Sequence, residues 1–160
     1  MQAEQHAKIE LLKKSIKNKG SLTLPSFGYS MYPFIKEHDV CTFVPCEIQT
    51  LNKGDVVLFY TDEGNLTAHR FLEKKQVLNK TQFLFKGDTN LLPDLPVFQD
   101  QIIGKLEQIN RNGKISFVHD LSAKVWAYVI FTFPILSKIL RKYVNILRKR
   151  KSNLNSGASL

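Results

Sequence analysis

Short apolar runs separated by turn residues dominate the chain between residues 39 and 117. The runs are rich in β-branched and aromatic residues, a composition typical of strands. Two polar stretches between them, residues 62–65 and 110–113, are typical of hairpin turns. The spacing predicts a mainly β fold: a coiled antiparallel sheet or partly closed barrel. We expect strands over residues 40–44, 56–60, 66–72, 82–86, 102–109 and 115–118.

The first residues of the chain have a different pattern, in which apolar side chains recur among lysines. The spacing of Ile9, Leu11, Leu12 and Ile16 predicts a short helix over residues 3–18. The segment lacks the uninterrupted apolar run of a signal peptide or a membrane span. We therefore expect an N-terminal helix that does not anchor the protein in a membrane.

A second apolar segment follows the last predicted strand. Residues 125–137 are uncharged, but this run of about 13 residues is shorter than the roughly 17 to 25 that cross a bilayer, and Pro134 interrupts it. Residues 139–147 mix apolar side chains with cations and predict an amphipathic helix. Three interpretations fit: a segment lying at a membrane interface, a helix covering the protein's own sheet, or a tail anchor. We expect the first.

Length and composition set the domain organisation. A chain of 160 residues that is 43% hydrophobic is long enough for one domain with a real core. We expect an N-terminal helix at 1–20, a β-rich domain at 21–120, an apolar and basic helical segment at 121–151, and a disordered tail at 152–160.

The net charge of +9 is concentrated at the two ends of the chain. Basic residues near an anionic membrane surface contribute on the order of 1 kcal/mol each, so the C-terminal cations favour membrane lipids as a partner. No nucleic acid is expected, because stacking aromatics are not interleaved with these cations. We expect peripheral membrane association through this segment, with the side of the membrane left open. The cations are Lys138, Arg141, Lys142, Arg148, Lys149, Arg150 and Lys151.

The two cysteines, Cys41 and Cys46, lie close together in an apolar stretch. In a strand, their odd spacing places them on opposite faces, which argues against a disulfide. We interpret them as small buried hydrophobic residues. No paired His or Cys lies near them, so we expect neither a metal site nor a cofactor.

Ser30 is a candidate nucleophile on a stiff turn. It lies between Gly28, which permits backbone dihedrals closed to other residues, and Pro33, whose φ is fixed. A turn serine that merely hydrogen-bonds the backbone is the alternative interpretation. A nucleophilic serine needs a base and a group that orients this base, and both would have to come from other parts of the chain.

Two later stretches supply such partners. His69 lies within the predicted strand 66–72, and Asp88 and Asp94 lie in and beyond the loop after residue 86. Imidazole titrates near neutral pH, which suits a general base. The alternative for His69 is an ordinary half-buried strand histidine.

Four short motifs occur along the chain, in the order Ser30-Met31-Tyr32-Pro33, Gly54-Asp55-Val56-Val57, His69-Arg70 and Lys86-Gly87-Asp88-Thr89-Asn90. Together they resemble the motifs of the type I signal peptidase family. The resemblance spans roughly residues 25 to 107. It implies a coiled β-sheet fold shared with self-cleaving LexA-type repressors. Most bacterial members carry Lys before the Arg of the third motif, whereas the endoplasmic-reticulum and archaeal type and some bacterial relatives carry His, as this chain does.

The resemblance implies roles for the residues near the nucleophile. Ser30 would attack the scissile carbonyl, and its own amide, with a backbone donor near Gly28, would bind the oxyanion. Met31 would line a substrate pocket, unless it is simply a core residue.

The base and its orienting carboxylate follow the same logic. His69 would take the proton of the nucleophile and return it to the leaving amine. Either Asp88 or Asp94 would orient His69, and the other would be structural. Arg70 points to the face of the strand opposite His69, so we expect it to form a scaffold salt bridge.

The expected function is therefore a membrane-associated serine endopeptidase of the Ser-His type that cleaves a signal or leader peptide from an exported precursor. The resemblance implies small side chains just before the cut and an extended substrate paired to a strand edge. Two alternatives stay open: a LexA-like self-cleaving regulator and a catalytically silent membrane-binding module. A LexA-like regulator carries a DNA-binding domain ahead of its nucleophile, and the 29 residues that precede Ser30 are too few for one.

Overall fold

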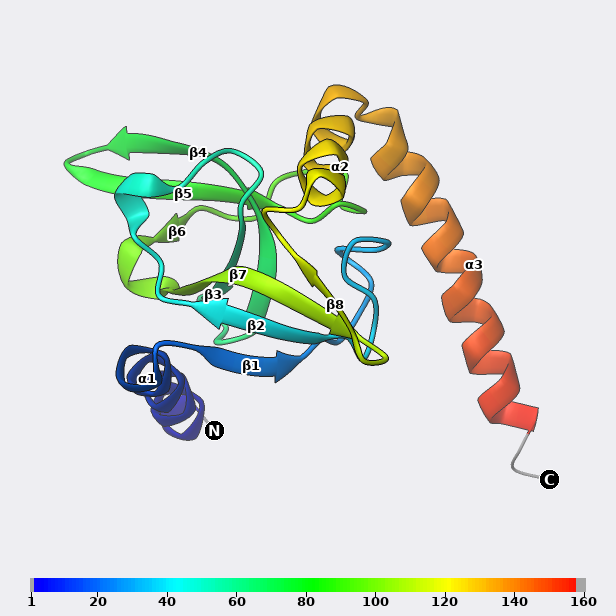
Figure 1. Ribbon diagram of the computed structural model, residues 1–160, viewed down its shortest axis with the longest axis horizontal. Coiled ribbons are helices and arrows are strands. Elements are labelled where there is room, and N and C mark those ends of the chain that lie inside the picture. The colour runs from blue at the N-terminus through cyan, green and yellow to red at the C-terminus, as the bar shows by residue number, and fades with distance from the viewer. Residues whose placement is uncertain (1, 158–160) are drawn as a thin grey trace.

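The protein folds around one antiparallel sheet, seen in a computed structural model that describes residues 2–157. The strands pair in the order β1-β2-β7-β3-β4-β5-β6, and β8 pairs with β7. The sheet curls on itself, with a helix at one side and two helices at the other (Figure 1). The predicted mainly β, antiparallel curled fold is thus confirmed. The strands are β1 Leu22–Pro25, β2 Val40–Val44, β3 Val56–Tyr60, β4 Leu66–Val77, β5 Lys80–Lys86, β6 Val97–Phe98, β7 Ile102–Arg111 and β8 Lys114–Phe117.

Two of these strands were not predicted. β1 pairs with β2 from Leu22 opposite Phe43 to Pro25 opposite Val40, and β6 adds only two residues beside β5. The β4–β5 hairpin is also longer than expected, because β4 continues to Val77. Both added strands are too short to show a period of two in the sequence.

β7 joins the two halves of the sheet, since it pairs with β2, β3 and β8. Register shifts on either side of it, at Thr42/Phe43 and Leu58/Phe59, bend the strands and help the sheet to curl. Gly104 of β7 leaves space where the N-terminal helix crosses. A Cβ there would lie 2.5 Å from Ile16 Cδ1 and 2.8 Å from the Val44 carbonyl oxygen.

The core has two clusters, one on each side of the curled sheet. The first includes Met31 and Ile35 from the turn before β2, packed with Phe43, Leu58 and Leu106. The second is built from aromatic and aliphatic side chains: Val57, Phe59, Phe71, Phe83, Phe85 and Val97. Because the turn residues belong to the first cluster, burial of apolar area fixes the position of Ser30 beside them.

The N-terminal helix α1, Gln2–Lys19, matches the predicted helix over residues 3–18. Its Ile9 and Ile16 are each 4% exposed and pack on the body of the protein, whereas Leu11 is 67% exposed. The seven-residue spacing of Ile9 and Ile16 places both on the buried face.

Two helices follow the sheet and form an elbow. They are α2, Leu121–Thr132, and α3, Ile135–Gly157, so α3 continues past residue 151, where we expected a disordered tail. The helices meet at Phe133 and Pro134 with a bend of 103°. Among the described residues, no single helix has the length and apolarity to cross a membrane; by these measures only the bent pair passes. We call α2 and α3 together the elbow.

The two cysteines are free thiols. Cys41 is buried on β2, and Cys46 is half-buried just beyond that strand. Burial raises the pKa of Cys41 to about 12 and that of Cys46 to about 11. Both therefore stay protonated at neutral pH.

Candidate active site

Ser30 lies in a closed turn between β1 and β2. The ends of this turn are joined by two backbone hydrogen bonds: the Ser26 amide donates to the Asp39 carbonyl at 2.8 Å, and the His38 amide donates to the Ser26 carbonyl at 2.9 Å. Gly28 has φ +80°, the left-handed conformation that the sequence led us to expect of a glycine here. Ser30 itself is half-buried. We call residues 26–39 the serine turn.

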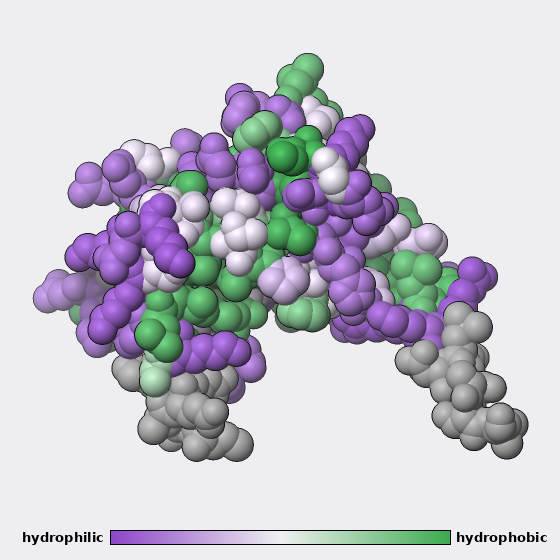
Figure 2. Space-filling model, turned by 60° about the horizontal axis from the view of Figure 1, so that its bottom comes forward, coloured by the Kyte–Doolittle hydropathy of each residue, from purple (hydrophilic) through white to green (hydrophobic). Residues whose placement is uncertain are grey.

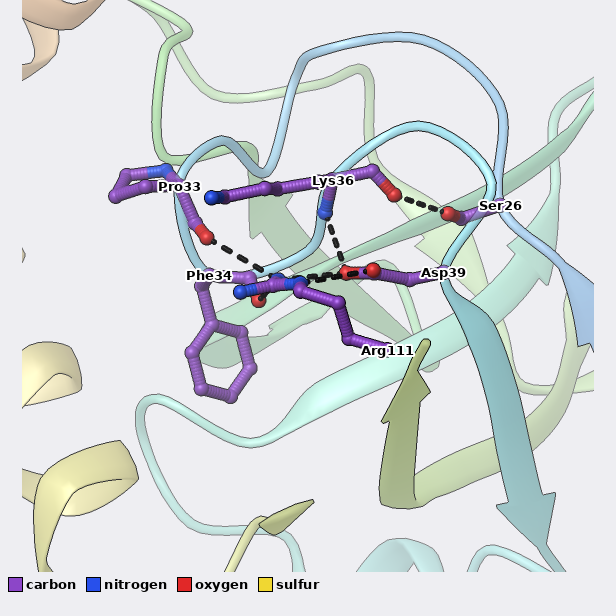
Figure 3. Close-up of polar contacts among 6 residues, drawn as sticks. All are labelled: Ser26, Pro33, Phe34, Lys36, Asp39 and Arg111. Atoms are coloured by element: carbon purple, nitrogen blue, oxygen red, sulfur yellow. Dashed lines mark hydrogen bonds and ion pairs between the residues drawn. The ribbon is translucent and has the colours of Figure 1, made fainter. Parts of the chain in front are cut away.

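Arg111, at the end of β7, binds the serine turn through its guanidinium (Figure 3). Its guanidinium donates to both carboxylate oxygens of Asp39, at 2.8 and 2.6 Å. It also donates to the carbonyls of Phe34 at 3.0 Å and Pro33 at 3.4 Å. The same Asp39 accepts the Lys36 amide at 2.7 Å. Its hydrogen bonds raise the pKa of Arg111, so the clamp stays charged.

His69 is buried on β4, opposite Val57 of β3. Its Nδ1 lies 2.6 Å from Asp94 Oδ2. A carboxylate only accepts hydrogen bonds, so Nδ1 donates to it, and in the neutral imidazole Nε2 is then the acceptor. Asp94 is held in turn, because its amide donates to the Phe85 carbonyl at 2.8 Å. The pair has the geometry of a base with its orienting carboxylate.

Gly87 lies between the serine turn and the His69 side chain. A Cβ on Gly87 would lie 2.9 Å from the Ser30 carbonyl oxygen and 3.0 Å from His69 Nε2. The Thr89 amide donates to that same carbonyl at 2.9 Å, so the loop after β5 is attached to the serine turn. Only a residue without a side chain fits between Ser30 and the Nε2 edge of His69. This is a physical reason for glycine in the Lys-Gly-Asp motif.

Ser30 and His69 line one cavity of about 590 Å³. Gly28 and Met31, the other predicted site residues, also line it. No hydrogen bond joins the Ser30 and His69 side chains, both of which the structure describes. In serine peptidases such a contact often forms only when substrate binds. The remaining wall is mainly apolar: Leu12, Leu24, Pro25, Phe27, Ile35, Cys41, Phe43, Leu58, Leu66 and Ala68.

α1 and β1, which lie on one side of the molecule, both contribute residues to the wall of this cavity. Figure 2 turns that side toward the reader and shows apolar side chains at its centre with polar ones around them. The first four residues of β4, Leu66 to His69, pair with β3 alone, since the pairing with β5 begins at Arg70. β1 is likewise an edge strand. Two strand edges therefore border the cavity.

Asp88 does not contact His69, so the structure corrects its candidacy as the orienting carboxylate. It is 2% exposed and accepts two hydrogen bonds from Arg70, at 2.7 and 3.2 Å. Trp126 of α2 donates to it at 2.8 Å. Arg70 also donates to the Gly54 carbonyl at 3.0 Å, and the predicted scaffold salt bridge of Arg70 is confirmed.

The Ser30 amide has the properties of an oxyanion donor. Within the described part of the chain it donates to no carbonyl and no side chain. The Ser30 carbonyl, by contrast, is occupied by the Thr89 amide. An unpaired backbone N–H can receive the charge that develops on an attacked carbonyl oxygen, so the Ser30 amide is available for that role.

Sequence reasoning missed several residues that build the site. Arg111 and Asp39 are 72 positions apart, and nothing in their local sequence indicates that they meet. Trp126 is 38 positions from Asp88 and was noted only as part of an apolar run. For Gly87, its place in the Lys-Gly-Asp motif was the one indication that the sequence offered.

Two further histidines whose side chains the structure describes, His38 and His119, are exposed and lie outside this cavity. Among the described residues, no three His, Cys, Asp or Glu side chains are grouped so that they could hold a metal ion. No known family model matches the chain, and no curated protein matches it.

Proposed function

We propose that the protein is a serine endopeptidase that cleaves a signal or leader peptide from an exported precursor. The observation that carries the proposal is the 2.6 Å contact between His69 Nδ1 and Asp94, with the other edge of the imidazole turned toward the serine turn. A structural histidine has no need of a half-buried carboxylate on one nitrogen and a side-chain-free approach to a serine at the other.

The residues have the following roles in this proposal. The Ser30 hydroxyl attacks the scissile carbonyl, its proton passes to His69 Nε2, and Asp94 stabilises the imidazolium. The Ser30 amide binds the oxyanion. When the tetrahedral intermediate collapses, the C–N bond breaks and His69 gives its proton to the leaving amine. Water, deprotonated by His69, then hydrolyses the ester on Ser30.

The substrate would be an extended peptide. The free edges of β1 and of residues 66–69 in β4 support this, because each offers backbone donors and acceptors beside the cavity. Alternate side chains of such a peptide would enter an apolar cavity of about 590 Å³, with Met31 in its wall. The resemblance to signal peptidases adds a preference for small residues before the cut.

The test is cleavage of a panel of leader-bearing precursors, analysed by mass spectrometry. The wild-type protein is compared with Ser30→Ala and with Ser122→Ala, which removes an exposed hydroxyl on α2. We expect a single cut after a small residue, lost in Ser30→Ala and kept in Ser122→Ala. Equal cleavage by wild type and Ser30→Ala would refute the proposal. If no precursor is cut while an acylating inhibitor labels other serines as fast as Ser30, a catalytically silent module becomes the better account.

A further inference from the structure

α3 carries an exposed apolar stripe that the fold does not use. Ile135, Ile139 and Ile146 are 56%, 56% and 44% exposed. Their spacing of four and then seven residues places them on one face of the helix. Isolated exposed isoleucines are ordinary, but three in line on one helix form a patch. We call these residues the isoleucine stripe.

A stripe of cations runs beside it. Lys138, Lys142 and Lys149 are all exposed and repeat the same spacing three positions further along the helix. Side chains three residues apart are neighbours on a helix surface, so each lysine lies next to one isoleucine. The sequence from residue 121 onward contains eight Lys and Arg residues and no Asp or Glu. We call these three residues the lysine stripe.

α2 and the bend also carry exposed apolar side chains. Leu121, Val125 and Tyr128 are 78%, 50% and 69% exposed and are spaced by four and three residues. Phe133, at the bend, is 52% exposed. In Figure 1 the bend projects beyond the sheet.

The opposite face of the elbow is already occupied by the protein. On α3, Val144 is buried and Lys151 pairs with Glu37 at 2.7 Å. On α2, Trp126 binds Asp88. Part of the elbow thus packs on the serine turn and on the loop after β5. The outer stripes are therefore not needed for docking the elbow to the domain.

We propose that the outer face of the elbow is a docking surface for an anionic phospholipid bilayer, on which the elbow lies without spanning it. The apolar stripes would enter the acyl boundary while the lysine stripe reaches the phosphates. Charge complementarity selects an anionic bilayer over a second copy of this chain, whose elbow carries the same positive charge. The bend of 103° gives two short apolar segments rather than one membrane-length helix.

This inference goes beyond the peptidase and does not depend on it. The stripes belong to residues outside the cavity of Ser30 and His69. Binding can therefore be measured with Ser30→Ala protein, and its failure would say nothing about catalysis.

The experiment is flotation of the full chain with vesicles of mixed phosphatidylglycerol and phosphatidylcholine, at low and high salt. One variant replaces the isoleucine stripe (Ile135→Gln, Ile139→Gln, Ile146→Gln), since glutamine keeps helix propensity. A second replaces the lysine stripe (Lys138→Gln, Lys142→Gln, Lys149→Gln). A control replaces Lys74, Lys75 and Lys80 by Gln, three exposed lysines of the β4–β5 hairpin, with the same change in net charge.

We expect wild type to float with anionic vesicles and to release at high salt. A basic residue at an anionic surface raises the partition coefficient about fivefold, so the lysine-stripe variant should bind about 100-fold more weakly. The isoleucine-stripe variant should lose a similar factor, and the hairpin control less than about threefold.

Three results would overturn the proposal. The first is equal losses in the hairpin control and the lysine-stripe variant, which would indicate unspecific attraction. The second is salt-resistant binding to purely zwitterionic vesicles that ignores the lysine stripe, which would indicate a spanning insertion. The third is a dimer in solution that dissociates in the isoleucine-stripe variant while vesicle binding is unchanged. Circular dichroism checks that each variant keeps its helices.

Discussion

Asp88 and Asp94 are six residues apart, yet replacing each by asparagine should harm a different property of the protein. Asp88 and Arg70 form an ion pair whose side chains are 1% and 3% exposed. Asp88→Asn keeps the shape but leaves the Arg70 charge buried without a counter-charge. Removing one partner of a buried pair costs about 3 to 5 kcal/mol. For a domain of this size, the midpoint of thermal unfolding should fall by roughly 6 to 20 °C.

Asp94→Asn should act on catalysis instead. The Asp94 side chain is 21% exposed and its partner is a histidine that need not be charged. Loss of this contact should therefore lower the free energy of unfolding by no more than about 1 kcal/mol. An asparagine no longer stabilises an imidazolium and can hold His69 in the wrong tautomer. By analogy with other serine peptidases, kcat should fall roughly 10³- to 10⁴-fold.

The assay pairs urea and thermal unfolding with turnover of a cleaved precursor, expressed per folded molecule. Arg70→Gln is the matched control for Asp88→Asn, because it breaks the same pair from the other side. The two aspartates do not have these separate roles if Asp88→Asn is as stable as wild type and inactive, or if Asp94→Asn keeps full turnover.

Gly87→Ala should abolish cleavage while the protein stays folded, because the added methyl lies 2.9 Å from the Ser30 carbonyl oxygen and 3.0 Å from His69 Nε2; wild-type turnover in this variant would contradict the site geometry. Arg111→Gln should lower both turnover and, by about 2 kcal/mol, the free energy of unfolding, since the serine turn loses its charged clamp; urea titration checks it, and unchanged turnover would show that the clamp does not position Ser30. Cys46 should react slowly with iodoacetamide at pH 9. Burial raises its pKa to about 11, so about 1% of it is thiolate in the folded protein against about half in the unfolded chain, a difference of about 50-fold. For the same reason any stability from keeping this thiol neutral is present below pH 9 and is lost as the pH rises toward 11; equal alkylation rates in native protein and in urea would contradict the burial.

The central strands could be predicted because their sequences carry their own boundaries. β2 and β3 begin and end where we expected, since each is a β-branched and aromatic run between turn residues. β1 escaped notice because it has four residues and ends in Pro25, which is tolerated only because β1 is an edge strand. Its pairing partner, not its own pattern, makes it a strand.

The choice between the two aspartates could not be predicted, because it depends on contacts between distant segments. The position of Asp94 depends on the loop after β5 folding back, where its amide meets the Phe85 carbonyl. Asp88 is turned toward Arg70 by Trp126, which arrives from a helix 38 positions later. The spacing of residues along the chain indicates neither of these two contacts. The alternation of His69 and Arg70 along β4 was readable, and it correctly separated the two side chains.

The central claim, that Ser30 is the nucleophile, is tested most directly by trapping its acyl form. If Ser30 is the nucleophile, a leader peptide ester with a small residue before the cut should acylate the protein faster than water removes the acyl group. Acid quenching, digestion and mass spectrometry then locate the ester. We predict it on Ser30, absent in Ser30→Ala and formed much more slowly in Asp94→Asn. An acyl group on another residue, or turnover of the ester without any adduct on Ser30, would contradict the account.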